Sequence, residues 1–64
     1  MFDFTKDEYE MLKEKLMLND EMSQILEMKI KRYSIVQISM ELNLSERTVN
    51  RRISELKKKI RKLL

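Results

Sequence analysis

The chain has 64 residues and a net charge of +3, and it contains no glycine, proline, cysteine or histidine. The missing cysteine and histidine exclude disulfides, thiol catalysis, the usual general base and the usual zinc ligands, so we expect no enzyme and no bound metal or cofactor. The remaining residues are mostly strong helix formers, which predicts an all-α fold.

Charge is distributed unevenly along the chain. Residues 1–30 carry eight acidic and four basic side chains, a net charge of −4, whereas residues 31–64 carry ten basic and three acidic ones, a net charge of +7. A basic half of this kind is typical of proteins that bind nucleic acid. No apolar stretch approaches the roughly 20 residues of a membrane span, and the N-terminus has no secretory signal pattern. We therefore expect a cytoplasmic protein without a membrane partner.

Two helices are expected in the acidic half. Thr5 followed by Glu8 fits a capping box, in which two side chains satisfy each other's free backbone amides, and this helix should end near residue 17. Either Asn19 or Asp20 caps the second helix, because both side chains accept amide hydrogen bonds well. That helix should end near residue 32.

Two further helices are expected in the basic half. Ser34 with Gln37 forms a second capping box, and the short helix that follows should end at Asn43, which tolerates a left-handed backbone. Ser45 caps the last helix, and nothing in the sequence stops that helix before the chain ends. Its apolar residues recur every three or four positions, at Val49, Ile53, Leu56, Ile60 and Leu63.

The third and fourth helices have the spacing of a helix-turn-helix. This motif needs small or apolar residues where two helices cross, a turn residue that accepts positive φ, and an apolar residue after it. β-Branched residues further along then pack the second helix against the first. The residues that fill these positions are Ile38, Ser39, Leu42, Asn43, Leu44, Val49 and Ile53.

The polar residues of the last helix lie on the side away from this core. If Val49 points inward, a rotation of about 100° per residue turns Arg47 and Arg51 outward. Arg can bond guanine with two hydrogen bonds, and Asn can do the same to adenine. The predicted base-reading residues are Arg47, Asn50, Arg51 and Ser54. The predicted phosphate contacts, which set affinity rather than sequence preference, are Lys31, Arg32, Ser34, Thr48, Arg52, Lys57 and Lys58.

Residues 18–60, LNDEMSQILEMKIKRYSIVQISMELNLSERTVNRRISELKKKI, resemble the DNA-binding domain of LuxR/GerE-type regulators. They are also similar to region 4 of bacterial sigma factors. The resemblance implies a four-helix domain that binds promoter DNA through its helix-turn-helix. It departs from the LuxR pattern in the segment SELKKKIRKLL, because that family usually has a break after the recognition helix.

These observations predict an all-α, four-helix helix-turn-helix domain with a long C-terminal recognition helix. Residues 1–64 would form this single DNA-binding domain, with an N-terminal helix over 1–18, the helix-turn-helix core over 34–54 and a helical extension over 55–64. The predicted function is sequence-specific binding of double-stranded DNA by a bacterial or phage transcriptional regulator. The helix that starts near Glu46 would enter the major groove.

Other interpretations stay open. The same fold can serve as a protein-interaction module whose basic face binds a sigma factor or an RNA polymerase subunit. The last helix can also act mainly in oligomerisation. We expect a homodimer, because DNA-binding proteins of this kind commonly pair to read two half-sites. The candidate dimer contacts are Leu56, Ile60 and Leu63; alternatively the N-terminal segment covers Ile60 and Leu63.

Overall fold

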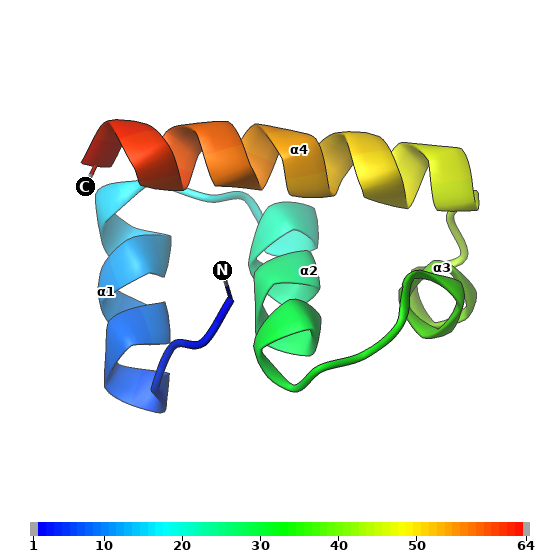
Figure 1. Ribbon diagram of the computed structural model, residues 1–64, viewed down its shortest axis with the longest axis horizontal. Helices are drawn as coiled ribbons and strands as arrows, with labels where there is room; N and C mark the ends of the chain where they lie inside the picture. Colours follow the sequence, from blue (N-terminus) through cyan, green and yellow to red (C-terminus); the bar gives the residue numbers. More distant parts are fainter. Residues whose placement is uncertain (1, 64) are drawn as a thin grey trace.

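The computed structural model describes residues 2–63 as four helices joined by short turns. The helices are α1 (Lys6–Lys15), α2 (Asp20–Ile30), α3 (Ile35–Leu42) and α4 (Glu46–Leu63). α1 and α2 stand side by side, α3 lies at the far end of the molecule, and α4 runs across the tops of the others (Figure 1). Between residues 2 and 63 there is no strand, and the predicted all-α fold with a long last helix is confirmed.

A capping side chain explains where each of the first three helices begins. The Thr5 hydroxyl accepts the backbone N–H of Glu8 at 3.2 Å, and the Glu8 carboxylate accepts the N–H of Thr5 at 2.9 Å. Ser34 and Gln37 make the same reciprocal pair at the start of α3. At α2 the cap is Asn19, whose side chain accepts a backbone N–H at 2.8 Å. Both predicted capping boxes are therefore confirmed.

A residue with a left-handed backbone stands at or just after the end of each of the first three helices, although the chain has no glycine. These residues are Met17 (φ 51°), Arg32 (φ 67°) and Asn43 (φ 58°). After α1 the N–H of Leu18 returns to the carbonyl of Lys13 at 3.2 Å, which is the Schellman closure of a helix end. The turn after α2 closes in the same way. Asn43 was predicted for this role, whereas Met17 and Arg32 were not.

All four helices contribute to one apolar core. Leu12 of α1 and Ile38 of α3 are buried there with three residues of α2 and four of α4. The α4 residues recur at the predicted helical spacing, and none is more than 6% exposed. The full set is Leu12, Met22, Ile25, Leu26, Ile38, Val49, Ile53, Leu56 and Ile60. The same side of α4 therefore faces the core from Val49 to Ile60.

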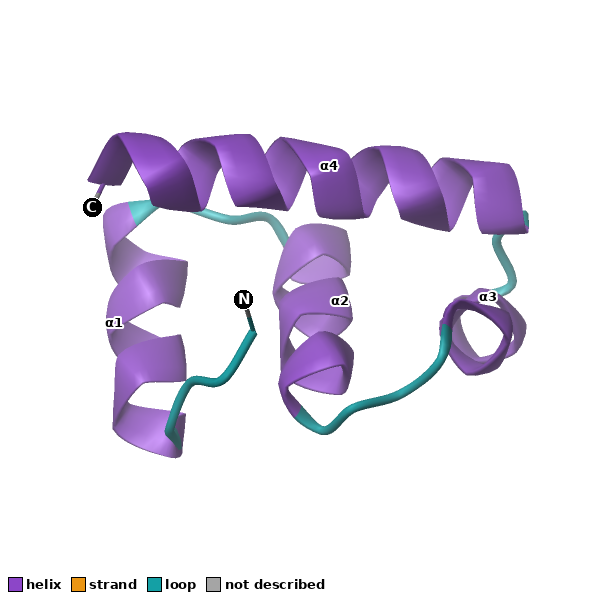
Figure 2. Cartoon of the chain, in the orientation of Figure 1, coloured by secondary structure: helices purple, strands orange, loops and turns teal. Residues whose placement is uncertain are grey.

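The segment before α1 turns back and runs between α1 and α2 (Figure 2). Phe2 and Phe4 are half-buried and pack against the core. Lys29 of α2 lies over the ring of Phe2, with its Nζ 5.9 Å from the ring centre. The N-terminal segment is thus part of the same packed unit as the helices. The outer limits of the predicted domain, residues 1 and 64, lie outside the described residues.

Ser23 is a polar residue buried in α2, and its replacement by Ala is expected to stabilise the protein. Its side chain is 5% exposed, and its hydroxyl has no hydrogen-bond partner among residues 2–63. An unpaired buried hydroxyl is costly and Ala is the better helix former, so Ser23→Ala should raise the free energy of unfolding by about 1 kcal/mol. Urea denaturation measures this change. The control Ser54→Ala, at an exposed position of α4, should change stability by less than about 0.5 kcal/mol; a loss of stability in Ser23→Ala would contradict the expectation.

Candidate nucleic-acid interface

α3 and α4 form the helix-turn-helix that the spacing predicts. In Figure 1 α3 is seen nearly along its axis while α4 lies across the view, so the two helices cross steeply. Asn43 makes the turn with φ 58° and ψ 40°, and the N–H of Leu44 bonds to the carbonyl of Ser39 at 2.9 Å. Ile38 and Val49 are fully buried in the core that joins the two helices. The side chains of these residues therefore hold α4 at a fixed angle to α3.

The start of α4 is closed by a short hydrogen-bonded cap. The Ser45 hydroxyl accepts the backbone N–H of Thr48 at 3.1 Å and donates to the Thr48 hydroxyl at 2.9 Å. This cap fixes the backbone at Glu46 and Arg47, in the first turn of α4. The cap therefore stabilises the first turn of α4, which includes Arg47 of the predicted base-reading residues.

The four predicted base-reading residues share the exposed side of α4, and we call them the reading face: Arg47, Asn50, Arg51 and Ser54. Each is exposed, while Val49 and Ile53 between them are buried. Within residues 2–63, neither Arg47 nor Arg51 has a carboxylate within ion-pair distance. The donors of the reading face therefore point to solvent and can bond an external partner.

The predicted phosphate contacts fall into two groups. Lys31 and Arg32 lie after α2 and form exposed ion pairs, with Glu27 at 3.2 Å and with Asp3 at 3.4 Å. Pairs as exposed as these contribute little stability, so breaking them to bind a phosphate would cost little. The others lie at the start of α3 or along α4, and the structure places Ser34 and Lys58 at exposed positions and Thr48, Arg52 and Lys57 at half-buried ones.

Arg52 differs from the other predicted phosphate contacts, because it is held by two carboxylates. Its Nε donates to Glu21 of α2 at 2.7 Å, and its Nη1 donates to Glu55 at 3.4 Å. The hydrogen bond and charge of Glu21 raise the pKa of the Arg52 guanidinium. This side chain therefore ties α4 to α2, and sequence reasoning missed that role because Glu21 lies 31 residues away.

The three candidate dimer contacts differ in exposure, and the homodimer itself stays a prediction. Leu56 and Ile60 are 0% exposed in the single chain, so they present no surface to a second copy. Ile60 belongs to the core that includes Leu12 of α1, and this answers the open question of what covers it. Leu63 is 39% exposed and is the one candidate that still reaches the surface.

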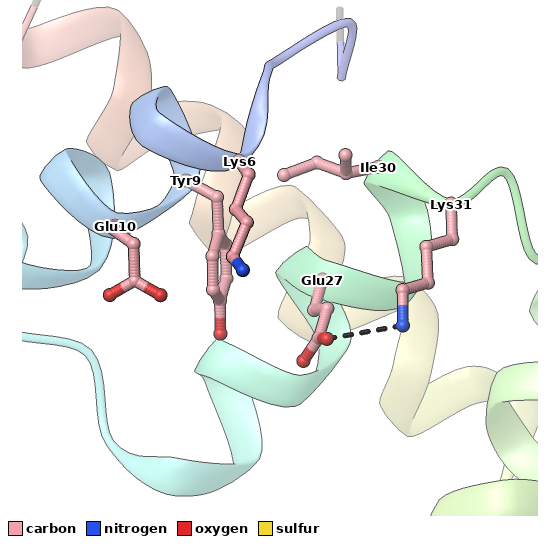
Figure 3. Close-up of a pocket in the computed structure, with 6 residues that line it drawn as sticks. All are labelled: Lys6, Tyr9, Glu10, Glu27, Ile30 and Lys31. Carbon is pink, nitrogen blue, oxygen red and sulfur yellow. Dashed lines mark ion pairs between the residues drawn. The ribbon is translucent and has the colours of Figure 1, made fainter.

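A hollow of about 360 Å³ lies between α1 and α2 (Figure 3). The Tyr9 ring stands in it, and burial raises the pKa of its phenol, which donates to the carbonyl of Ser23 at 3.3 Å. At the rim Lys31 pairs with Glu27. These polar groups hold α1 against α2, which is a structural role. Among residues 2–63, no three acidic side chains are grouped to hold a metal ion, and no helix is long and apolar enough to cross a membrane.

Sequence reasoning also missed a set of basic residues at the C-terminal end of α4. Lys59, Arg61 and Lys62 are exposed there, and Lys15 at the end of α1 lines the same shallow hollow as Lys59 and Lys62. Helical periodicity predicts that Arg61 and Lys62 are exposed on the same side of α4 as Arg47, because both point within about 60° of its direction. Nothing local could have placed Lys15 beside them.

Comparison with known proteins gives one match. The family model GerE, described as bacterial regulatory proteins of the luxR family, matches residues 4–62. This match covers nearly the whole chain, including α1, α2, α3, all but the last residue of α4, and the reading face. No curated protein and no solved structure matches the chain. The similarity to region 4 of sigma factors stays a prediction.

Proposed function

The chain belongs to the luxR family of bacterial regulatory proteins, and from this premise we propose that it reads duplex DNA with the N-terminal half of α4. Membership in the family makes it a DNA-binding regulator of the helix-turn-helix type. The proposal adds that α4 enters the major groove and that the reading face contacts base edges. An α-helix has the right width for this groove, and its N-terminal residues are those that reach bases in helix-turn-helix proteins.

The observation that carries the proposal is the division of α4 into two sides. Val49 and Ile53 are buried while Arg47 and Arg51, between and beside them, are exposed and unpaired within residues 2–63. Free guanidinium groups on a rigid helix suit the paired acceptors of guanine. Asn50 adds the donor and acceptor that suit adenine. The reading face therefore has the chemistry of base recognition as well as positive charge.

Contacts with the phosphate backbone of DNA would fix the position of α4 in the groove. Lys31 and Arg32 precede α3, and the start of α3 carries free amides and a partial positive charge that favour phosphate. Lys57 and Lys58 follow the reading face on α4. We include these residues as phosphate contacts together with Ser34 and Thr48. We propose for Arg52 the role of orienting α4, because its guanidinium is already bonded to Glu21 and Glu55.

The experiment that tests this function is selection from a random duplex library, followed by sequencing of the bound DNA. An enriched motif supports sequence-specific reading. A palindrome with half-sites about 10 base pairs apart supports the predicted homodimer, whereas a single half-site supports a monomer. Binding at low salt without enrichment would contradict base reading. It would favour the alternative in which the basic face binds a protein such as a sigma factor or a polymerase subunit.

Replacement of Arg51 by Ala is expected to weaken binding to the selected sequence by about 1–3 kcal/mol and to relax preference at one base pair. Arg51 is exposed at the middle of the reading face, so its loss should not affect folding. Fluorescence anisotropy against every single-base variant of the motif measures both effects. Lys58→Ala is the matched control, since loss of a phosphate contact should weaken binding equally on all sequences. An equal loss on all sequences in Arg51→Ala would make Arg51 a phosphate contact instead.

A further inference from the structure

The exposed side of α4 stays basic well beyond the reading face. Lys58 and Lys62 follow Arg51 at intervals of seven and four residues, so they point within about 20° of its direction. From Arg47 to Lys62 this row extends about 22 Å, at 1.5 Å per residue. The major groove is about 12 Å wide. A helix that reads bases with its first turns therefore reaches past the groove with its last ones.

α1 adds to the same end of the molecule. The last turn of α4 lies over the end of α1 (Figure 1). A shallow hollow of about 330 Å³ forms where they meet, and it is lined by three lysines and two leucines. Its lining residues are Lys15, Leu16, Lys59, Lys62 and Leu63. We define the basic end as Lys15, Lys58, Lys59, Arg61 and Lys62.

The side chains of the basic end form no ion pairs within the described residues 2–63. All five side chains are exposed, and no carboxylate of residues 2–63 lies within ion-pair distance of any of them. Like charges this close repel one another over the Debye length of about 10 Å. They would also repel a second basic end placed against Leu63 in a two-fold dimer. A polyanion, in contrast, would relieve this repulsion.

We propose that the basic end is a second DNA contact, which grips the phosphate backbone bordering the groove that the reading face occupies. This inference rests on the proposed function and extends it. The start of α3 would hold the backbone on one side of the groove, and the basic end would hold the backbone on the other. α1 thereby has a role in binding, because Lys15 supplies one of the phosphate contacts.

The test measures how duplex affinity depends on salt, with the selected motif and a scrambled duplex of equal length. Each lost phosphate contact lowers the slope of log affinity against log salt by about 0.9. When salt rises from about 50 to 200 mM, the unmodified protein loses affinity by some factor. For Lys59→Gln/Lys62→Gln that factor should be roughly 12 times smaller. Its preference for the motif over the scrambled duplex should stay the same.

Matched controls separate local contacts from net charge. Lys6→Gln/Lys13→Gln removes the same two charges from α1, on residues outside the basic end, and should keep the original slope. Lys15→Gln should lower the slope by about 0.9, whereas Lys6→Gln on the same helix should not. Circular dichroism confirms that each variant is folded.

The outcomes distinguish the two proposals. Equal slopes for Lys59→Gln/Lys62→Gln and for its control, with the motif still preferred, would overturn the second contact and leave the proposed function standing. If the unmodified protein prefers no sequence, the proposed function fails. A slope change confined to the basic-end variants would then still identify a phosphate-binding surface.

Discussion

Replacement of Val49 by Asp is expected to unfold the protein. Val49 is 0% exposed and lies in the core between α3 and α4. The new carboxylate would have no partner there, and a buried unpaired charge costs at least about 4 kcal/mol. A domain of this size has a total stability of roughly 3–10 kcal/mol. Loss of the helical circular dichroism signal, or a melting transition at much lower temperature, measures the effect.

The neighbouring residue provides the control. Asn50→Asp introduces the same side chain one position along α4, at an exposed site. This variant should stay folded and should bind DNA more weakly, because the new charge repels phosphate. A Val49→Asp variant that melts close to the unmodified protein would mean that α4 is rotated about its axis. The reading face would then be assigned to the wrong residues.

Truncation of Ile60 to Ala is expected to lower the free energy of unfolding by about 2–5 kcal/mol, the range for a buried isoleucine. The loss should be the same at every protein concentration, because Ile60 packs against residues of its own chain. Denaturant unfolding at concentrations spanning a hundredfold range measures both the size and the concentration dependence of the effect. A loss that is independent of concentration means that Ile60 packs within its own chain. A loss that depends on concentration means that it packs against a second chain.

Leu63 is the matched control for Ile60, one turn further along the same helix. It is 39% exposed, so Leu63→Ala should cost less than Ile60→Ala. A midpoint that falls on dilution in the unmodified protein, and stays constant in Leu63→Ala, would support the predicted dimer through Leu63. A small effect of Ile60→Ala would contradict the burial of Ile60.

The parts of the fold that depend on neighbouring residues could be predicted from the sequence. Thr5, Ser34 and Ser45 cap their helices because the side-chain oxygen of a cap residue can reach the free amide three residues further on. Asn43 was expected to turn the chain, since a short polar side chain tolerates the left-handed conformation. The exposure of the reading face followed from helical periodicity alone.

The features that were missed depend on residues far apart in the chain. The bond between Arg52 and Glu21 exists because α4 crosses α2, and no local pattern specifies which acid an exposed arginine will meet. The cover of Ile60 likewise depends on where α1 lies. Apolar spacing predicted that Ile60 is buried. The sequence did not show whether a second chain or the N-terminal helix covers it.

The turn after α1 holds backbone strain at a position where the side chain has no role in either proposed DNA contact. Met17 holds a left-handed backbone with an ordinary side chain, a state that costs roughly 1–2 kcal/mol and that glycine adopts freely. The side chain is 88% exposed and lies outside the reading face and the basic end. Natural proteins are held above a threshold of stability rather than at its maximum. Glycine at residue 17 would thus stabilise the fold without changing the reading face or the basic end.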